Sequence, residues 1–122
     1  MTISLKENLD KIDALMSYVK STDAKIKYEE DTYTSMAGAP AFTVKVIVAN
    51  VNGVKDPFSE VSQVDVAVTG SAAITESNPI LLSSGEGIIH ISNTIVESVT
   101  LSLSDSGSTG LDVSHTASIT FS

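Results

Sequence analysis

Hydrophobic side chains follow two different periods along this chain, and the change of period divides it. In the first twenty residues the apolar positions recur at steps of four and three, the spacing of one face of an α-helix. From Ala41 to the C-terminus apolar and polar side chains alternate instead, which is typical of half-buried β-strands. The pattern therefore predicts a short helix followed by a β-domain.

The predicted helix begins with a capping signal and carries one apolar seam. Ser4 and Glu7 have the S-x-x-E spacing of a capping box. The seam runs for about two heptads and consists of Leu5, Leu9, Ile12, Met16 and Val19. A helix this short needs outside support, either from its own domain or from another chain or partner. We favour the second interpretation and expect these five residues to serve oligomerisation or docking.

The stretch between residues 21 and 40 has a looser pattern. Residues 24–29 alternate briefly and fit either a short edge strand or a continuation of the helix. Residues 35–40 are small and flexible, as in a linker. We therefore divide the chain into an N-terminal anchoring or oligomerisation segment, 1–36, and a β-sandwich, 37–122.

The second half shows six or seven short apolar–polar runs, with turn signals about every ten residues. The clearest runs are residues 42–49, 64–69, 80–82, 89–91, 99–104 and 117–121. No helical pattern intervenes between them. This rhythm predicts two sheets packed face to face.

Composition and charge limit what such a domain can do. The chain has no Trp, three Phe and three Tyr, so Val, Ile, Leu and Ala must build the core. All seven basic residues are Lys, and the net charge is −8. From Asp31 onward two lysines oppose nine acids, which gives −7 for the body. Nucleic-acid binding needs phosphate-neutralising cations, so we do not expect it.

Cysteine is absent, which excludes disulfides and thiolate zinc sites. The first residues lack the apolar core of a secretory signal, and no apolar stretch is long enough for a membrane span. We therefore expect a protein made in a cytoplasm, without membrane insertion and without export by the usual route.

Four segments carry a resemblance to a known family. They are residues 42–46, 64–72, 97–105 and 116–121. In these segments the chain resembles the bacterial immunoglobulin-like domains of invasin-type adhesins and of many phage virion proteins. The resemblance covers about two thirds of the chain. It implies an immunoglobulin-like β-sandwich, but it does not extend to the first forty residues. Together with the helical pattern of the first twenty residues, we therefore expect an all-β fold, an immunoglobulin-like β-sandwich of about seven strands with a short N-terminal α-helix.

Candidate metal ligands are few. His90 and His115 lie in strand-like contexts without a third ligand at a typical spacing, so ordinary histidines are a better interpretation than zinc ligands. Residues 105–112 have some features of a calcium loop but lack its order of acids and its closing Glu. A hairpin loop of small polar residues is the better interpretation, and we expect no metal site and no cofactor.

Catalytic motifs are also missing. The sequence has no G-x-S-x-G elbow and no glycine-rich phosphate loop. A sugar-cleaving carboxylate pair normally lies in a cleft with aromatic platforms, which a small sandwich without Trp offers poorly. We therefore expect a protein that is not an enzyme and has no catalytic residues.

The missing export signal, the adhesin-like sandwich and the separate helix together favour a phage virion structural protein. We expect a capsid decoration (cementing) or head-fibre protein, attached through its N-terminal region with the sandwich projecting outward. Its partner would be the major capsid protein or another virion protein. A homo-oligomer is expected, with a trimer favoured, and the location would be the virion.

Two alternatives stay open. One is a host-surface glycan- or receptor-binding module of a phage tail fibre or bacterial adhesin, with weak glycan binding. Its candidate surface contact is Phe58, beside Asp56 and Pro57 in a turn, although Phe58 would also fit a residue tucked over the edge of the core. The other is a piece of a larger cell-surface protein.

Overall fold

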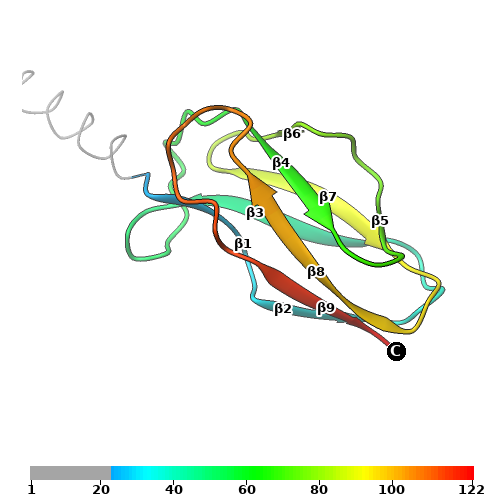
Figure 1. Cartoon of the computed structure of the whole chain (residues 1–122). Helices are drawn as coiled ribbons and strands as arrows, with labels where there is room; N and C mark the ends of the chain where they lie inside the picture. Colours follow the sequence, from blue (N-terminus) through cyan, green and yellow to red (C-terminus); the bar gives the residue numbers. More distant parts are fainter. Residues whose placement is uncertain (1–22) are drawn as a thin grey trace, which may run out of the picture.

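The computed structural model describes residues 23–122, which fold into two curled β-sheets packed against each other (Figure 1). The first sheet contains, in spatial order, β1 (Lys25–Tyr28), β3 (Phe42–Ala49), β7 (Glu86–Ser92) and β5 (Ala73–Ile74). The second contains β2 (Thr32–Ser35), β9 (Ala117–Phe121), β8 (Glu97–Ser104), β4 (Gln63–Val68) and β6 (Ile80–Leu81).

The two N-terminal strands connect the sheets along one side of the sandwich. β1 runs antiparallel to β3, whereas β2 runs parallel to β9. At the bend between them the Glu29 N–H donates to the Lys45 carbonyl (3.0 Å), and the Ser118 N–H donates to the Asp31 carbonyl (2.9 Å). One continuous stretch of chain therefore pairs first with one sheet and then with the other.

The loop that precedes β9 closes the free edge of β1. The Ile26 N–H donates to the Asp112 carbonyl (2.9 Å), and the Asp112 N–H donates to the Ala24 carbonyl (3.2 Å). Pairing of this kind covers backbone groups that an edge strand would otherwise expose.

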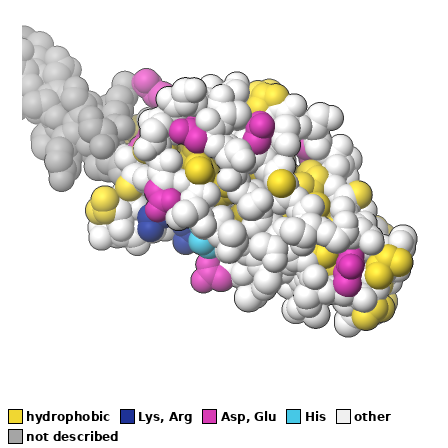
Figure 2. All heavy atoms as spheres, in the orientation of Figure 1, with side chains coloured by type: hydrophobic (Ala, Val, Ile, Leu, Met, Phe, Trp, Pro, Cys, Tyr) yellow, Lys and Arg dark blue, Asp and Glu magenta, His cyan; other side chains and the backbone are white. Residues whose placement is uncertain are grey.

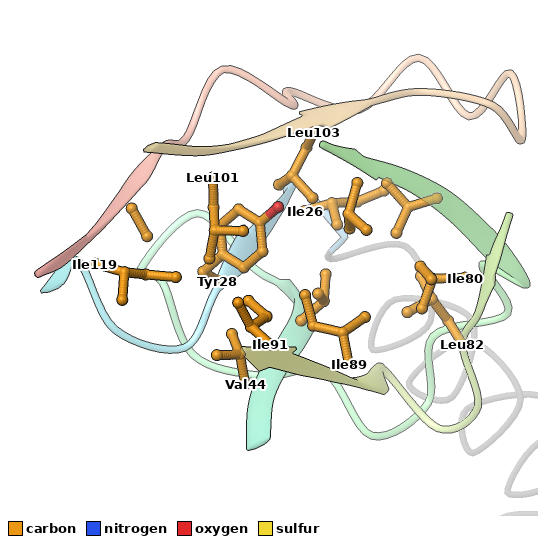
Figure 3. Close-up of a cluster of buried hydrophobic side chains, with 14 of the residues drawn as sticks. Ile26, Tyr28, Val44, Ile80, Leu82, Ile89, Ile91, Leu101, Leu103 and Ile119 are labelled. Atoms are coloured by element: carbon orange, nitrogen blue, oxygen red, sulfur yellow. The ribbon is translucent and has the colours of Figure 1, made fainter. Parts of the chain in front are cut away.

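The core lies between the sheets and follows directly from the alternation in the sequence. Every second residue of β3, β8 and β9 points inward, and each buried aliphatic side chain contributes about 1.5–3 kcal/mol. The Tyr28 ring lies among these side chains (Figure 3) and donates its hydroxyl to the Ser102 carbonyl at 2.6 Å. The hydrogen bond satisfies the one polar atom of this buried ring.

The fold class predicted from the sequence needs correction. A sandwich of about seven strands with an N-terminal helix was expected, whereas residues 23–122 form nine strands and contain no helix. The predicted helix lies outside the described residues. β6 falls within the predicted run 80–82, whereas β5, with two residues, is too short to show a period and was not predicted.

The stretch assigned to the N-terminal segment also contains strands. Of the two interpretations left open for residues 24–29, the edge strand is confirmed by β1, and residues 32–35 form β2. Ile26 and Tyr28 are fully buried, so this stretch contributes to the core of the sandwich. Residues 36–41 form the loop between β2 and β3.

The sandwich has two ends that lie at opposite extremes of its strands (Figure 1). The proximal end holds Asp23, where the described chain begins, and the loops 50–62, 82–85 and 105–116. The distal tip holds Ser122 and the loops 36–41, 69–72 and 93–96. The described chain therefore enters at one end and finishes at the other.

Candidate interaction surface

Asn93 and Glu97 tie the three loops of the distal tip together. Asn93 is buried, with 4% exposure, and its backbone carbonyl accepts the Gly38 N–H at 2.8 Å. Its side-chain amide donates to Glu97 Oε1 (2.8 Å), which also accepts the Ser71 N–H at 2.7 Å. The Asn93 backbone carbonyl, together with the side chains of Asn93 and Glu97, thus links all three loops to the start of β8.

The same contacts set the charge state of Glu97. The hydrogen bond from the Asn93 side chain, followed by that from the Ser71 N–H, lowers the pKa of the Glu97 carboxyl. Gly70 makes room for this carboxylate, since a Cβ there would lie 2.8 Å from Glu97 Oε1, and its φ of +69° favours glycine. Glu97 therefore serves the tip as an internal acceptor of hydrogen bonds.

This tied framework presents apolar side chains to solvent. Met36 is 67% exposed, Ile95 is 48% exposed and Val96 is 71% exposed. The Ile95 N–H donates to Asn93 Oδ1 at 2.9 Å, so the buried amide also positions this loop. Hydrophobic side chains gather at this end of the molecule in Figure 2. We call Met36, Ile95 and Val96 the tip patch.

The proximal end also exposes apolar residues. Val51 is 78% exposed, Val54 is 60% exposed and Phe58, the candidate contact from the sequence, is 47% exposed. The Phe58 N–H donates to Asp56 Oδ1 at 2.9 Å. Phe58 therefore lies in the β3–β4 loop at the proximal end, away from the tip patch.

A pair of carboxyl groups distinguishes the proximal end. Asp23 Oδ2 accepts the Ser59 hydroxyl at 3.0 Å, while Asp23 Oδ1 is buried. Burial, together with a hydrogen bond to the neighbouring Asp56 carboxyl, raises the pKa of Asp23 to about 6. Asp56 is itself only 3% exposed. Two acids therefore share a site that disfavours a second negative charge.

The two histidines are placed in separate pairs. His90 Nδ1 lies 2.6 Å from Glu76 Oε2, and the His90 N–H donates to Glu76 Oε1 at 2.7 Å. Burial acts to raise the pKa of Glu76, but the hydrogen bonds from His90 outweigh it, so the pKa is lowered. Within the described part of the chain no three His, Asp or Glu residues are arranged to hold a metal ion.

His115 has a defined tautomer. Its Nδ1 accepts the Tyr28 N–H at 3.1 Å, so the ring proton is on Nε2, which donates to Asp31 Oδ1 at 2.7 Å. This hydrogen bond lowers the pKa of the Asp31 carboxyl. His115 thereby fastens the loop before β9 to β1 and to the bend that follows it.

The loop 105–112 uses its first carboxylate to close itself. Asp105 Oδ1 accepts the N–H and the hydroxyl of Thr109, and Oδ2 accepts the Gly110 N–H at 2.8 Å. The hydrogen bond from the Thr109 N–H is the main cause of the lowered pKa of Asp105. The arrangement matches a self-closed polar loop of the kind the sequence favoured.

A shallow apolar groove of about 370 Å³ lies beside the edge strand β6. Its lining includes Pro79, Leu81 and Ile88, with Glu76 among the lining residues. Leu81 is 75% exposed. The Glu76 carboxylate is already paired with His90, so the groove brings together no free acid and base.

Sequence reasoning found one of the exposed apolar residues and missed the tip patch. The seam residues Leu5, Leu9, Ile12, Met16 and Val19 lie outside the described residues, and the expectation for them stays a prediction. Met36, Ile95 and Val96 were missed because lone apolar residues in loops carry no periodic signal. Among residues 23–122 no helix has the length and apolar character needed to cross a membrane.

Comparisons with known proteins identify the fold. No protein-family model and no curated protein matches the sequence. Among solved structures, a glycosyl hydrolase family 2 member from Bacteroides cellulosilyticus DSM 14838 is similar, with a TM-score of 0.63 and 16% identity over 84% of this chain and 15% of that chain.

Two structures of intimin are similar as well. The D00–D0 domains give a TM-score of 0.55 with 17% identity over 82% of this chain and 46% of that chain. The D0–D1 domains give 0.56 with 17% identity over 82% of this chain and 48% of that chain. The chain thus spans less than half the length of each structure, and at these identities the likeness concerns the fold. That fold is the bacterial immunoglobulin-like, adhesin-type sandwich.

Proposed function

We propose that this chain is a non-enzymatic structural protein of a phage virion, a capsid decoration or head-fibre protein. Its N-terminal region attaches to the major capsid protein or another virion protein and gathers copies into an oligomer, with a trimer favoured. The immunoglobulin-like body then projects outward from the particle.

The observation that carries this proposal is a core that closes within the described residues. The hydrophobic cluster runs from Ile26 to Phe121 and is covered by both sheets. The loop before β9 also pairs with β1, so the side of the sandwich nearest Asp23 is closed. A body of this kind leaves the apolar seam of residues 5–19 available to hold another surface.

Geometry and charge support an outward orientation. Asp23 and Ser122 lie at opposite ends of the strands, so a body held at its proximal end directs its tip away from the attachment (Figure 1). Residues 23–122 carry twelve acids and four lysines, which is a net charge of −8. Like charges on neighbouring bodies favour separated, solvated positions.

The test uses seam variants of the full chain. Leu9→Asp and Ile12→Asp together place two charges in the seam, whereas Ala14→Asp and Ser17→Asp place two charges on the opposite face of the predicted helix. In a co-sedimentation assay we expect the wild-type chain and the Ala14/Ser17 control to pellet together with virus particles. The Leu9/Ile12 variant should stay in the supernatant. If both variants pellet equally with the particles, or if the wild-type chain does not pellet with them, the proposal is contradicted.

A second candidate is a host-surface glycan- or receptor-binding module of a tail fibre or adhesin. The likeness to the domains of intimin and the half-exposed Phe58 favour it. A glycan array probed with the full chain and with Phe58→Ser tests the glycan-binding form of this candidate. Signals that disappear in the variant would support it, and a flat array would remove it.

A further inference from the structure

We infer that the tip patch is a docking surface for an apolar patch on another protein, edged by lysine or arginine. The surface consists of Met36, Ile95 and Val96 at the end of the sandwich opposite Asp23. It does not take part in the anchoring proposed above, so it gives the chain a second contact, at the projecting end.

The tip patch is preorganised by hydrogen bonds within the loops that carry it. The loops that carry the patch are held by the buried Asn93, which bonds to the Gly38 N–H, the Ile95 N–H and the Glu97 carboxylate. The Ala37 N–H also donates to the Ser122 carbonyl at 3.0 Å. A surface fixed in this way loses little freedom when a partner covers it, so more of its contact energy becomes affinity.

The exposed atoms of the tip patch are aliphatic carbon atoms and one thioether. Solvent-facing Met, Ile and Val side chains stay hydrated until an apolar surface covers them, and Met adapts its shape to its partner. Glycan recognition relies on aromatic platforms, but Phe42 near the tip packs its ring on Phe121, with ring centroids 6.3 Å apart. An apolar protein surface fits the patch better than a sugar.

The charge of the described body favours a basic partner. The tip loops 36–41, 69–72 and 93–96 contain no lysine, and the acidic Glu97 begins the strand that follows the last of them. Residues 23–122 carry a net charge of −8, four lysines against twelve acids. A basic partner is attracted by this field, whereas an anionic membrane or a second copy of the same body is repelled.

The methionines of the chain provide the experiment. The chain has three, and Met36 reports on the tip while Met16 reports on the seam. Full-length protein labelled at the methionine methyl groups is titrated with four probes: a tetraleucine peptide flanked by lysines, the same peptide flanked by glutamates, maltoheptaose, and phosphatidylglycerol vesicles. We expect the lysine-flanked peptide alone to shift the Met36 methyl signal.

Matched variants show whether the apolar patch itself binds. Ile95→Ser with Val96→Ser keeps the Met36 probe. We expect this variant to bind the lysine-flanked peptide about fivefold or more weakly than wild type. Val51→Ser with Val54→Ser also removes two exposed aliphatic side chains, but at the proximal end, and should change the affinity by less than about twofold.

Several results would overturn the inference. They are a Met36 signal that stays unmoved by the lysine-flanked peptide, an equal shift from the glutamate-flanked peptide, the sugar or the vesicles, and equal losses in the two variants. A lower molar mass of Ile95→Ser with Val96→Ser than of wild type in light scattering would also overturn it, because the tip would then bind a second copy of the chain. The pelleting test of the seam variants does not involve the tip, and the Met36 signal does not report on the seam. The two proposals can therefore fail separately.

Discussion

The two ends of the sandwich treat their acidic side chains in opposite ways. At the tip, Glu97 accepts two N–H donors and its pKa is lowered. At the proximal end, Asp23 shares a site with Asp56 and its pKa is raised to about 6. The tip therefore stabilises the negative charge of its carboxylate through N–H donors, whereas the proximal end brings two carboxyl groups together and disfavours a second negative charge.

The largest effect is expected from Asn93→Ala at the tip. The change removes the side-chain acceptor of the Ile95 N–H and the amide donor to Glu97, so the free energy of unfolding should fall by about 2–3 kcal/mol. Ser59→Ala, which removes one hydroxyl contact of Asp23, should cost about 1 kcal/mol or less. Urea unfolding of both variants measures the difference, and equal losses would remove the contrast between the ends.

A smaller effect, of opposite sign, is expected from Asp23→Asn. A raised pKa means that the Asp23 carboxyl stabilises the fold below its ordinary pKa of 3.8, and that this contribution is lost as the pH rises through about 6. The variant should therefore melt about 2 °C higher than wild type at pH 7.5 and show no gain at pH 4. Thermal melts at both pH values test this, and a gain at pH 4 would contradict it.

Glu97→Gln should reveal the reverse pH dependence. Because the pKa of Glu97 is lowered in the folded chain, its contribution is present above the ordinary value of 4.5 and is lost as the pH falls through the folded pKa. The melting temperature of wild type should therefore drop more steeply than that of the variant as the pH falls below 4.5. Parallel curves would show that the carboxylate has no such role.

The smallest effect is expected from Met36→Ser. Met36 is 67% exposed, so its side chain contributes little to folding and the free energy of unfolding should change by less than about 0.5 kcal/mol. Chemical denaturation measures this. A loss above about 1 kcal/mol would show that Met36 belongs to the core and not to a free surface.

Sequence reasoning predicted the strands that show their own alternation. β8 and β9 bury every second side chain, and β3 does so until its last four residues, which are all buried. The period of these strands is therefore visible without the structure. β2 was missed because it is polar, and only Tyr33 and Ser35 are partly buried on it. Its place comes from parallel pairing with β9, a long-range contact that local sequence does not encode.

The interaction surface was less predictable than the fold. The tip loops meet because Asn93 bonds to Gly38, fifty-five positions earlier in the sequence, through the hydrogen bond Gly38 N–H to Asn93 O. Phe58 drew attention as an aromatic residue in a turn, whereas the tip patch contains no aromatic residue. Loop surfaces are assembled by the whole fold, so single residues in them carry little local signal.

The division of the chain into a holding segment and a projecting body is tested most directly by the molar mass of the protein in solution. We predict that light scattering after size exclusion gives a multiple of the single-chain mass, three being favoured, for wild type and for Ala14→Asp with Ser17→Asp. Leu9→Asp with Ile12→Asp should give the mass of one chain. One and the same mass for all three proteins would contradict the account.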